Sequence, residues 1–397
     1  MLKRILEITL VMLVAVWIFG SYKTPESKNK NPENFQTPSE IGVPTTLGVE
    51  NTSIEKVENK TATTIETNPK PKVGQVKISV KPKPVIVVKV PEIVATSPTP
   101  APLLRQDYAG QAEPPPDFEK INTFARMATI NILCTAKGNE FSPISGTGIV
   151  ISPNGLILTN AHVAQYFLLG NLYTKDFIQC SIRTGSPAYP RYHAELVYIS
   201  PTWVEANKTE LKQDNPKGTG QNDFAFLRII DAIDSTTLPT FSYIPINTRE
   251  VIDVNEAVVL VSYPAGFLGG LSILQGLSVT SAVTVVQDIF TFKSNTIDVI
   301  SVGGTVVSQK GASGGAVVDK HSTLIGIIST SSNGNTTSSR ELNAITLGYI
   351  SRTLQTEIGY TLSNFLSLDI PNFAKSFQNT TAVSLTKILT DELTKTQ

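Results

Sequence analysis

Residues 146–163 read GTGIVISPNGLILTNAHV, residues 222–227 read NDFAFL, and residues 311–315 read GASGG. The three stretches contain, in that order, a histidine, an aspartate and a serine. A serine hydroxyl is a weak nucleophile at neutral pH, so it needs an imidazole to accept its proton and a buried carboxylate to fix the tautomer of that imidazole. The order therefore predicts a catalytic base, an orienting acid and a nucleophile. These residues are His162, Asp223 and Ser313.

Each of these residues also has a structural explanation when it is taken alone. His162 is one of three histidines and could be a structural side chain. Asp223 could cap the start of the apolar strand that follows it, and Ser313 could belong to a glycine-rich turn. The joint order of the three stretches favours the triad over three unrelated coincidences.

The sequence GASGG also fits the G-x-S-x-G turn that carries the nucleophile in α/β-hydrolases. That fold needs the chain order serine, acid, histidine. Only His321 follows Ser313, and at eight residues it is too near to be the late histidine of that fold. The esterase interpretation is therefore weak.

The N-terminus is typical of an export signal or a membrane anchor. Lys3 and Arg4 precede a run from Ile8 to Phe19 that is apolar apart from Thr9. No A-x-A-like cleavage site follows, which favours an uncleaved anchor over residues 1–21. As a helix, Ile5 to Gly20 would cover only about 24 Å of roughly 30 Å of hydrocarbon, so a cleaved signal peptide is the alternative. Because basic residues stay cytoplasmic, we expect the rest of the chain outside the cytoplasm, tethered to the cell membrane or secreted.

Residues 22–116 predict a disordered stalk. They contain 15 of the chain's 25 prolines with many Lys, Glu, Thr and Ser, so they cannot bury enough apolar surface to offset the entropy of ordering. The run from Val85 to Val90 lies between two prolines and favours an extended segment over a docking strand. The formal net charge of zero gives no reason to expect nucleic-acid binding.

From about residue 117 the pattern changes to short β-branched or alternating runs between Gly, Pro and Asn, which predicts an all-β body. Two groups of six strands suit two antiparallel barrels, because closure removes exposed sheet edges. A short helical segment is expected from about Ile350. The expected strands are Ala128–Thr135, Gly146–Ser152, Leu156–Thr159, Ile178–Thr184, His193–Ile199 and Asp223–Ile229, then Ala257–Tyr263, Leu277–Val286, Ile297–Val302, Ala316–Val318, Leu324–Ser329 and Leu342–Leu347.

Residues 146–163 are similar to the segment that leads to the catalytic histidine in HtrA/DegP-like members of the trypsin-like, chymotrypsin-fold serine peptidases. Residues 311–315 resemble the nucleophile loop of the same family. The resemblance implies two six-stranded Greek-key barrels with the active site between them. It also implies an oxyanion hole formed by the backbone N–H groups of Gly311 and Ser313.

The domain boundaries expected from this resemblance place His162 and Asp223 in the first barrel and Ser313 in the second. The first barrel covers residues 117–245 and the second covers residues 246–360. A helical tail, residues 361–397, is too short for a PDZ domain, so the peptidase domain is expected to lack one.

Specificity is inferred from positions relative to the nucleophile in the family. Val307 is expected near the floor of the primary pocket, with Ser329, Thr330 and Ser331 along its walls. None of the residues expected to line the pocket is a carboxylate that could pair with Lys or Arg, so an apolar side chain of modest size is predicted at P1. Ser329 is also a candidate to hydrogen-bond Asp223. The residue before the nucleophile is Ala312, which cannot form the salt bridge to a newly cut N-terminus that activates digestive members of the family.

Cys134 and Cys180 are the only cysteines. They fall in the first and fourth expected strands, which are neighbours where a barrel of this family closes, so the resemblance implies a disulfide. The alternative is a pair of buried thiols that point to opposite sides, because a shift of one residue reverses each side chain.

Two classes of function follow from the sequence. One is an extracytoplasmic, membrane-tethered serine endopeptidase that cleaves polypeptides through an acyl-enzyme, and the other is a non-catalytic binding module on the same scaffold. The intact triad favours the enzyme. Two cysteines and scattered histidines lack the spacing of a metal site, so no metal or other cofactor is expected.

Overall fold

The computed structural model describes residues 115–138, 141–213, 218–266, 268, 270–293, 295–331 and 341–395. The predicted anchor and nearly all of the predicted stalk, including Val85–Val90, lie outside these residues. No helix within the described ranges has the length and apolar character needed to cross a membrane.

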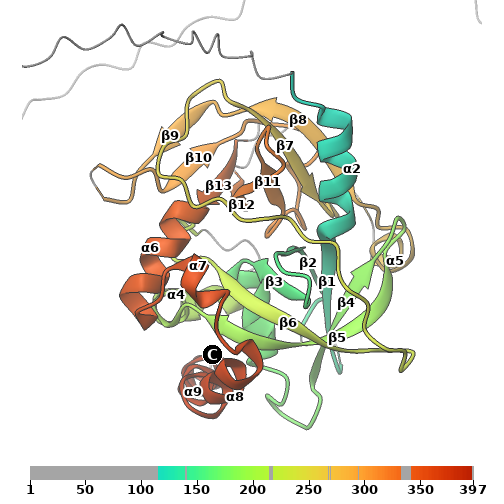
Figure 1. The fold of residues 1–397 in the computed structure, drawn as a ribbon. Coiled ribbons are helices and arrows are strands. Elements are labelled where there is room, and N and C mark those ends of the chain that lie inside the picture. The colour runs from blue at the N-terminus through green and yellow to red at the C-terminus, as the bar shows by residue number, and fades with distance from the viewer. Residues whose placement is uncertain are drawn as a thin grey trace, which may run out of the picture. The chain divides into compact units, whose positions relative to one another are not determined.

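Six antiparallel strands form a closed barrel in the order β1-β2-β3-β6-β5-β4 (Figure 1). The sequence predicts this first barrel, and the structure confirms it. Glycine is required inside it, because a Cβ at Gly148 would lie 2.7 Å from Ile157 Cγ2. The strands are β1 Thr129–Ala136, β2 Ile144–Val150, β3 Leu156–Thr159, β4 Ile178–Thr184, β5 Tyr189–Ile199 and β6 Ala225–Ala232.

The second group of strands forms a curled sheet in the order β8-β7-β11-β12-β13-β10-β9. Its two ends, β8 and β9, are separated by Val286 and Gln287 alone. Val286 N–H donates to the carbonyl of Glu256 on one side, and Gln287 N–H donates to that of Ser301 on the other. One bent run therefore changes partners between two residues and brings the ends of the sheet together. The strands are β7 Ala257–Ser262, β8 Thr280–Val285, β9 Asp288–Phe290, β10 Val299–Ser301, β11 Ala316–Val318, β12 Leu324–Ser331 and β13 Leu342–Thr346.

The second half thus keeps the predicted antiparallel, chymotrypsin-like arrangement but contains seven strands where the sequence predicts six. The prediction treats the segment before Val286 as one strand and misses β9. The bend is not visible in the sequence because β9 is only three residues long, too short to show a period in the sequence.

Helices cover the barrels more extensively than the sequence predicts. Helix α2 (Phe118–Ala128) is capped by Asp117, whose carboxylate accepts from Lys120 N–H, and it packs against β7 and β8 (Figure 1). Helix α5 (Gly270–Gln275) is held by Arg183, a fully buried side chain that donates to the carbonyls of its last residues. Neither helix is among the sequence predictions.

The stretch from Pro201 to Gln221 is polar and has the composition of an inserted surface loop, but its first part is helical. Residues Pro201–Asn207 form helix α4 and Lys208–Lys212 form the 3-10 helix η2. Ser200 caps α4 by accepting from Trp203 N–H, and Trp203 is buried. A capping serine followed by a proline in the first turn is a helix signal that the polar composition hides.

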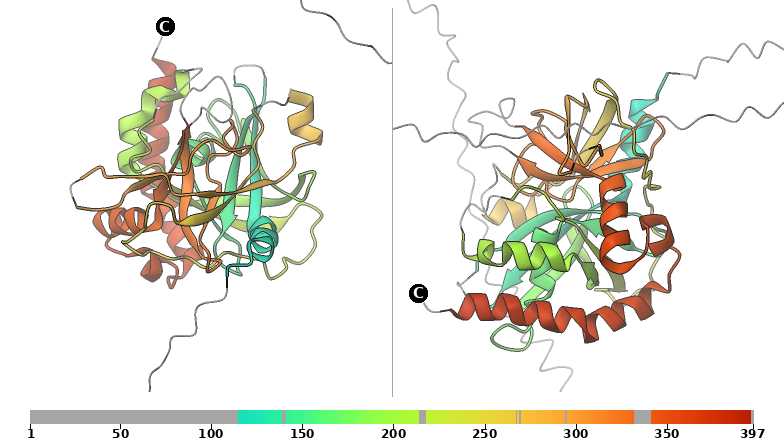
Figure 2. Two further views of the ribbon diagram at one scale, coloured as in Figure 1. Left: turned by 90° about the horizontal axis from the view of Figure 1, so that it is seen from above. Right: turned by 90° about the vertical axis from the view of Figure 1, so that its left-hand side faces the viewer.

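The helical C-terminal segment begins at Leu347, close to its predicted start, and packs on the first barrel. In Figure 2, α9 (red) lies beside α4 (light green), and α8 contacts β5. Phe365 and Phe377 join the apolar cluster under these helices, both with rings near Tyr198. The helices are α6 Leu347–Ile358, α7 Leu362–Phe365, α8 Ile370–Asn379 and α9 Thr381–Thr394.

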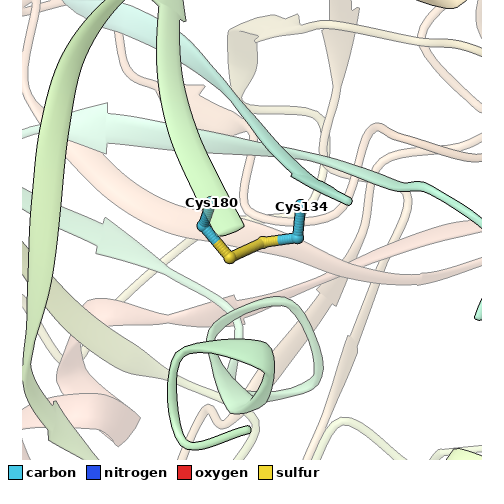
Figure 3. Close-up of a disulfide and its surroundings, with 2 residues drawn as sticks. All are labelled: Cys134 and Cys180. Atoms are coloured by element: carbon cyan, nitrogen blue, oxygen red, sulfur yellow. A yellow bond between two sulfur atoms is a disulfide. The ribbon is translucent and has the colours of Figure 1, made fainter. Parts of the chain in front are cut away.

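A disulfide joins Cys134 of β1 to Cys180 of β4 (Figure 3). The two residues are directly opposite in the antiparallel pairing of these strands, with their Cα atoms 4.0 Å apart. The bond ties the first strand to the fourth at the point where the barrel closes.

Candidate active site

His162 lies in α3 (Ala161–Ala164), a single turn that begins directly after β3. Asn160, the residue before this turn, is fully buried and its Nδ2 donates to the carbonyl of Asp223 at 2.8 Å. The turn is therefore fixed to the start of β6, and the histidine is placed beside the aspartate.

Asp223 accepts three hydrogen bonds. Its Oδ1 accepts from the backbone N–H of His162 at 3.0 Å, and its Oδ2 contacts His162 Nδ1 at 2.8 Å. Oδ2 also accepts from Ser329 Oγ at 2.8 Å. Because an ionised carboxylate can only accept, this arrangement puts the imidazole proton on Nδ1 and leaves Nε2 free to accept one.

The carboxylate is buried, whereas the imidazole reaches the surface. The side chain of Asp223 is 5% exposed and that of His162 is 33% exposed. Burial lowers the pKa of His162, but the charge of Asp223 and its hydrogen bond outweigh burial, so the pKa lies above its ordinary value of 6.5. Such a group has a high affinity for a proton on the ring nitrogen that faces away from the acid.

Ser313 lies in a turn that is anchored to the first barrel. Gly311 and Gly314 have φ of 91° and 82°, in the left-handed region that favours glycine. The carbonyl of Ser313 accepts from the N–H of Thr147 at 2.8 Å. A Cβ at Gly314 would lie 2.5 Å from Thr159 Oγ1, so the turn passes directly against the end of β3.

The Ser313 hydroxyl makes no hydrogen bond to His162 or to any other described residue. Hydrogen bonds of this kind often form only when substrate is bound. The structure therefore brings His162 and Asp223 into contact and places the Ser313 turn beside the strand that leads to His162.

Two N–H groups in the nucleophile loop have no acceptor among the described residues, and they belong to Gly311 and Ser313. The carbonyl of Lys310 accepts from Ala265 N–H at 2.6 Å. In a trans peptide the carbonyl and the following N–H point in opposite directions, so the N–H of Gly311 points away from Ala265. The loop therefore carries a pair of unpaired donors next to the serine.

The residues expected around the primary pocket have different environments. Val307 is fully buried in the apolar core of the second barrel. Ser329 is expected either along the wall of the pocket or as a hydrogen-bond donor to Asp223, and its hydroxyl points at Asp223. Thr330 and Ser331 lie at the end of β12, and their side chains are outside the described part of the structure.

Two further residues contribute to the site but are not predicted from the sequence. Tyr349 of α6 donates its hydroxyl hydrogen to Asn222 Oδ1 at 2.6 Å and accepts from Asn222 N–H at 3.0 Å. Asn222 has φ of 58°. The asparagine before the acid is a signal for a left-handed residue, but nothing in the sequence pairs it with Tyr349.

The second of these residues is Thr147 of β2, whose hydroxyl contacts the nucleophile loop. Its position between two glycines is visible in the first motif, but its partners are more than 100 residues away in the chain.

No cluster of three or more His, Cys, Asp or Glu side chains in the described ranges could hold a metal ion. A second histidine–aspartate pair, His193 with Asp231, lies on the outer surface of β5 and β6 with both side chains about half exposed.

Residues 146–327 match the family model of the trypsin-like peptidase domain. This segment is a trypsin-like peptidase domain. It contains His162, Asp223 and Ser313 and most of both barrels, which confirms the family expected from the motifs. No curated protein matches the chain. Among solved structures, the chain is similar to a serine endoprotease from Yersinia pestis, with 20% identity, 62% of this chain and 68% of that chain covered, and a TM-score of 0.38.

Proposed function

We propose that this chain is a serine endopeptidase that cleaves polypeptides through His162, Asp223 and Ser313. The observation that carries the proposal is the chain of hydrogen bonds from Ser329 to Asp223 to His162, which leaves His162 Nε2 free to accept a proton. The family match to the trypsin-like peptidase domain supports the same reaction class.

The chemistry follows from these groups. His162 Nε2 takes the proton of Ser313 Oγ as that oxygen attacks the scissile carbonyl carbon, and the carbonyl π electrons move to its oxygen. The resulting oxyanion is stabilised by the N–H groups of Gly311 and Ser313. The tetrahedral species collapses, the C–N bond breaks, and His162 gives its proton to the leaving amine.

The acyl-enzyme is hydrolysed by the same groups. His162 removes a proton from water, the hydroxide oxygen attacks the ester carbon, and the proton returns to Ser313 Oγ as the acid product leaves. Asp223 keeps the imidazole oriented and stabilises the imidazolium that forms twice in the cycle.

The alternative is a non-catalytic binding module on this scaffold. The absence of a hydrogen bond between the described Ser313 hydroxyl and His162 is compatible with that alternative. The unpaired N–H groups of Gly311 and Ser313 favour the enzyme. A fluorophosphonate probe separates the two, because it phosphonylates only a serine that has an active base.

The test uses the full chain and measures casein cleavage and probe labelling. Ser313→Ala and His162→Ala are each expected to remove nearly all turnover, and the double variant is expected to be no worse than either single variant. Ser272→Ala, at an exposed serine of α5, is the control and should retain activity. Undiminished cleavage by Ser313→Ala would refute the proposal.

We also propose that the peptidase acts outside the cytoplasm, tethered by residues 1–21. The basic and apolar N-terminus supports this location. The Cys134–Cys180 disulfide supports it independently, since such bonds persist in oxidising compartments. Membrane fractionation of the full chain, and of a variant without residues 1–21, tests the tether. Recovery of the full chain only in the soluble cytoplasmic fraction would contradict it.

A further inference from the structure

We propose that Thr147 is a positioning residue that holds the Gly311 N–H donor of the oxyanion hole through its side-chain hydroxyl. The proposal rests on the proposed function, because it concerns the same site. Thr147 belongs to β2 of the first barrel, whereas the loop that it holds belongs to the second.

Thr147 makes three hydrogen bonds to the second barrel and accepts one within the first. Its N–H donates to the carbonyl of Ser313 at 2.8 Å, and its Oγ1 donates to the carbonyl of Gly311 at 2.7 Å. The same Oγ1 accepts from the N–H of Tyr263 at 3.0 Å. The carbonyl of Thr147 accepts from Thr159 Oγ1 at 2.7 Å, so β3 holds Thr147 in turn. Thr147 is fully buried, so water has no access to replace these bonds.

The hydroxyl of Thr147 fixes one of the two peptide groups that flank the Cα of Gly311. The peptide before Gly311 is fixed because the carbonyl of Lys310 accepts from Ala265 N–H. The peptide after Gly311 is fixed because its carbonyl accepts from Thr147 Oγ1. Glycine otherwise rotates freely about φ and ψ, so these two bonds together define where the Gly311 N–H points.

The same hydroxyl also secures the other half of this clamp. Tyr263 lies two residues before Ala265, and its N–H uses Thr147 Oγ1 as acceptor. Loss of the hydroxyl therefore loosens both the peptide after Gly311 and the segment that holds the peptide before it. A valine at this position keeps the volume and the β-branch but leaves a buried N–H and a buried carbonyl without this partner.

The experiment compares Thr147→Val with Thr147→Ser in the full chain. Serine keeps a hydroxyl, and valine does not. Thr129→Val is the matched control, because Thr129 is a buried threonine of β1 whose Oγ1 donates to the carbonyl of Ala125 at 2.8 Å, away from the nucleophile loop. The readouts are kcat and KM for a peptide substrate, and the inhibition constant of a peptide aldehyde of the same sequence, whose adduct places an oxyanion in the hole.

Thr147→Val is expected to lower kcat about tenfold to a hundredfold with KM nearly unchanged, since the donors act on charge that develops in the transition state. It should weaken the aldehyde by a similar factor, while the affinity for the cleaved product peptide stays the same. Thr147→Ser should restore kcat to within about threefold of wild type, and Thr129→Val should affect only thermal stability.

Wild-type kcat and aldehyde affinity in folded Thr147→Val would overturn the proposal, as would an equal loss in Thr147→Ser. If the valine variant does not fold, Thr147→Cys is measured in its place, because a thiol is a weak donor and acceptor. It should have a kcat below that of the serine variant, and equality of the two would overturn the proposal. Failure of the proposed function has a different signature, namely wild type no more active than Ser313→Ala, and the role of Thr147 would then fall with it.

Discussion

The substitution Asp223→Asn tests the orienting acid with almost no change in shape. Oδ1 of Asp223 faces the backbone N–H of His162, and Oδ2 faces His162 Nδ1. An asparagine that keeps its oxygen against the backbone N–H presents its NH2 group to Nδ1. Nδ1 must then accept, the ring proton moves to Nε2, and the base can no longer take the proton of Ser313. The flipped amide places two donors, the NH2 group and the backbone N–H, against each other.

Only the first orientation avoids this repulsive contact, so it should dominate, and it is the orientation that removes the base. In the trypsin template the same change lowers kcat by about 10⁴, which corresponds to about 5.4 kcal/mol of transition-state stabilisation. We expect a loss of that size in kcat for a peptide substrate at pH 8, with KM changed by less than about threefold.

The control is Asp231→Asn, which alters the exposed pair with His193 and should leave kcat within about twofold of wild type. A folded Asp223→Asn variant with more than about a tenth of wild-type kcat would refute the tautomer argument, which requires a much larger loss.

Three further predictions follow from the same structure. Because the pKa of His162 is raised, kcat/KM should rise with pH through a midpoint above 6.5. Asp223 stabilises the protonated imidazole, so this contribution to the free energy of unfolding is complete below the unfolded-state pKa and is lost as the pH rises through that midpoint. Urea titrations from pH 5 to 9 should show this contribution in the wild type and not in Asp223→Asn. Replacing Cys134 and Cys180 together by alanine should lower the free energy of unfolding by about 3–4 kcal/mol, measured by denaturant titration against the oxidised wild type. Peptide-library profiling should return apolar residues at P1, since Val307 is buried and uncharged, and a preference for Arg or Lys would contradict this.

The sequence predicts the first barrel well because its strands are long and rich in β-branched residues. It also predicts the pairing of His162 with Asp223, since each lies next to an apolar run that is typical of a buried strand. The prediction fails where the backbone departs from regular pairing. The change of partner between Val286 and Gln287 depends on hydrogen bonds to Glu256, directly before β7, and to Ser301 of β10, which no local pattern encodes.

The polar stretch from Pro201 shows a different limit. Its composition is that of a loop, yet it contains a buried tryptophan and a capped helix, α4, that packs against α9. Helices this short are stabilised mainly by tertiary contact rather than by propensity, and the partner helix lies at the other end of the sequence. A reading that stops at local polarity cannot find such a pair.

The same dependence on distant partners explains how the acid is held. Ser329 of β12 donates to the carboxylate of Asp223, and Tyr349 of α6 fixes the left-handed residue Asn222 directly before it. Both partners follow the nucleophile in the chain, whereas the acid belongs to the first barrel. In the opposite direction, Thr147 of the first barrel holds the nucleophile loop of the second. Each half of the site is therefore oriented by the other half, so a local opening between the barrels removes the base and the donors together, and the proposed activity depends on the packed interface rather than on either barrel alone.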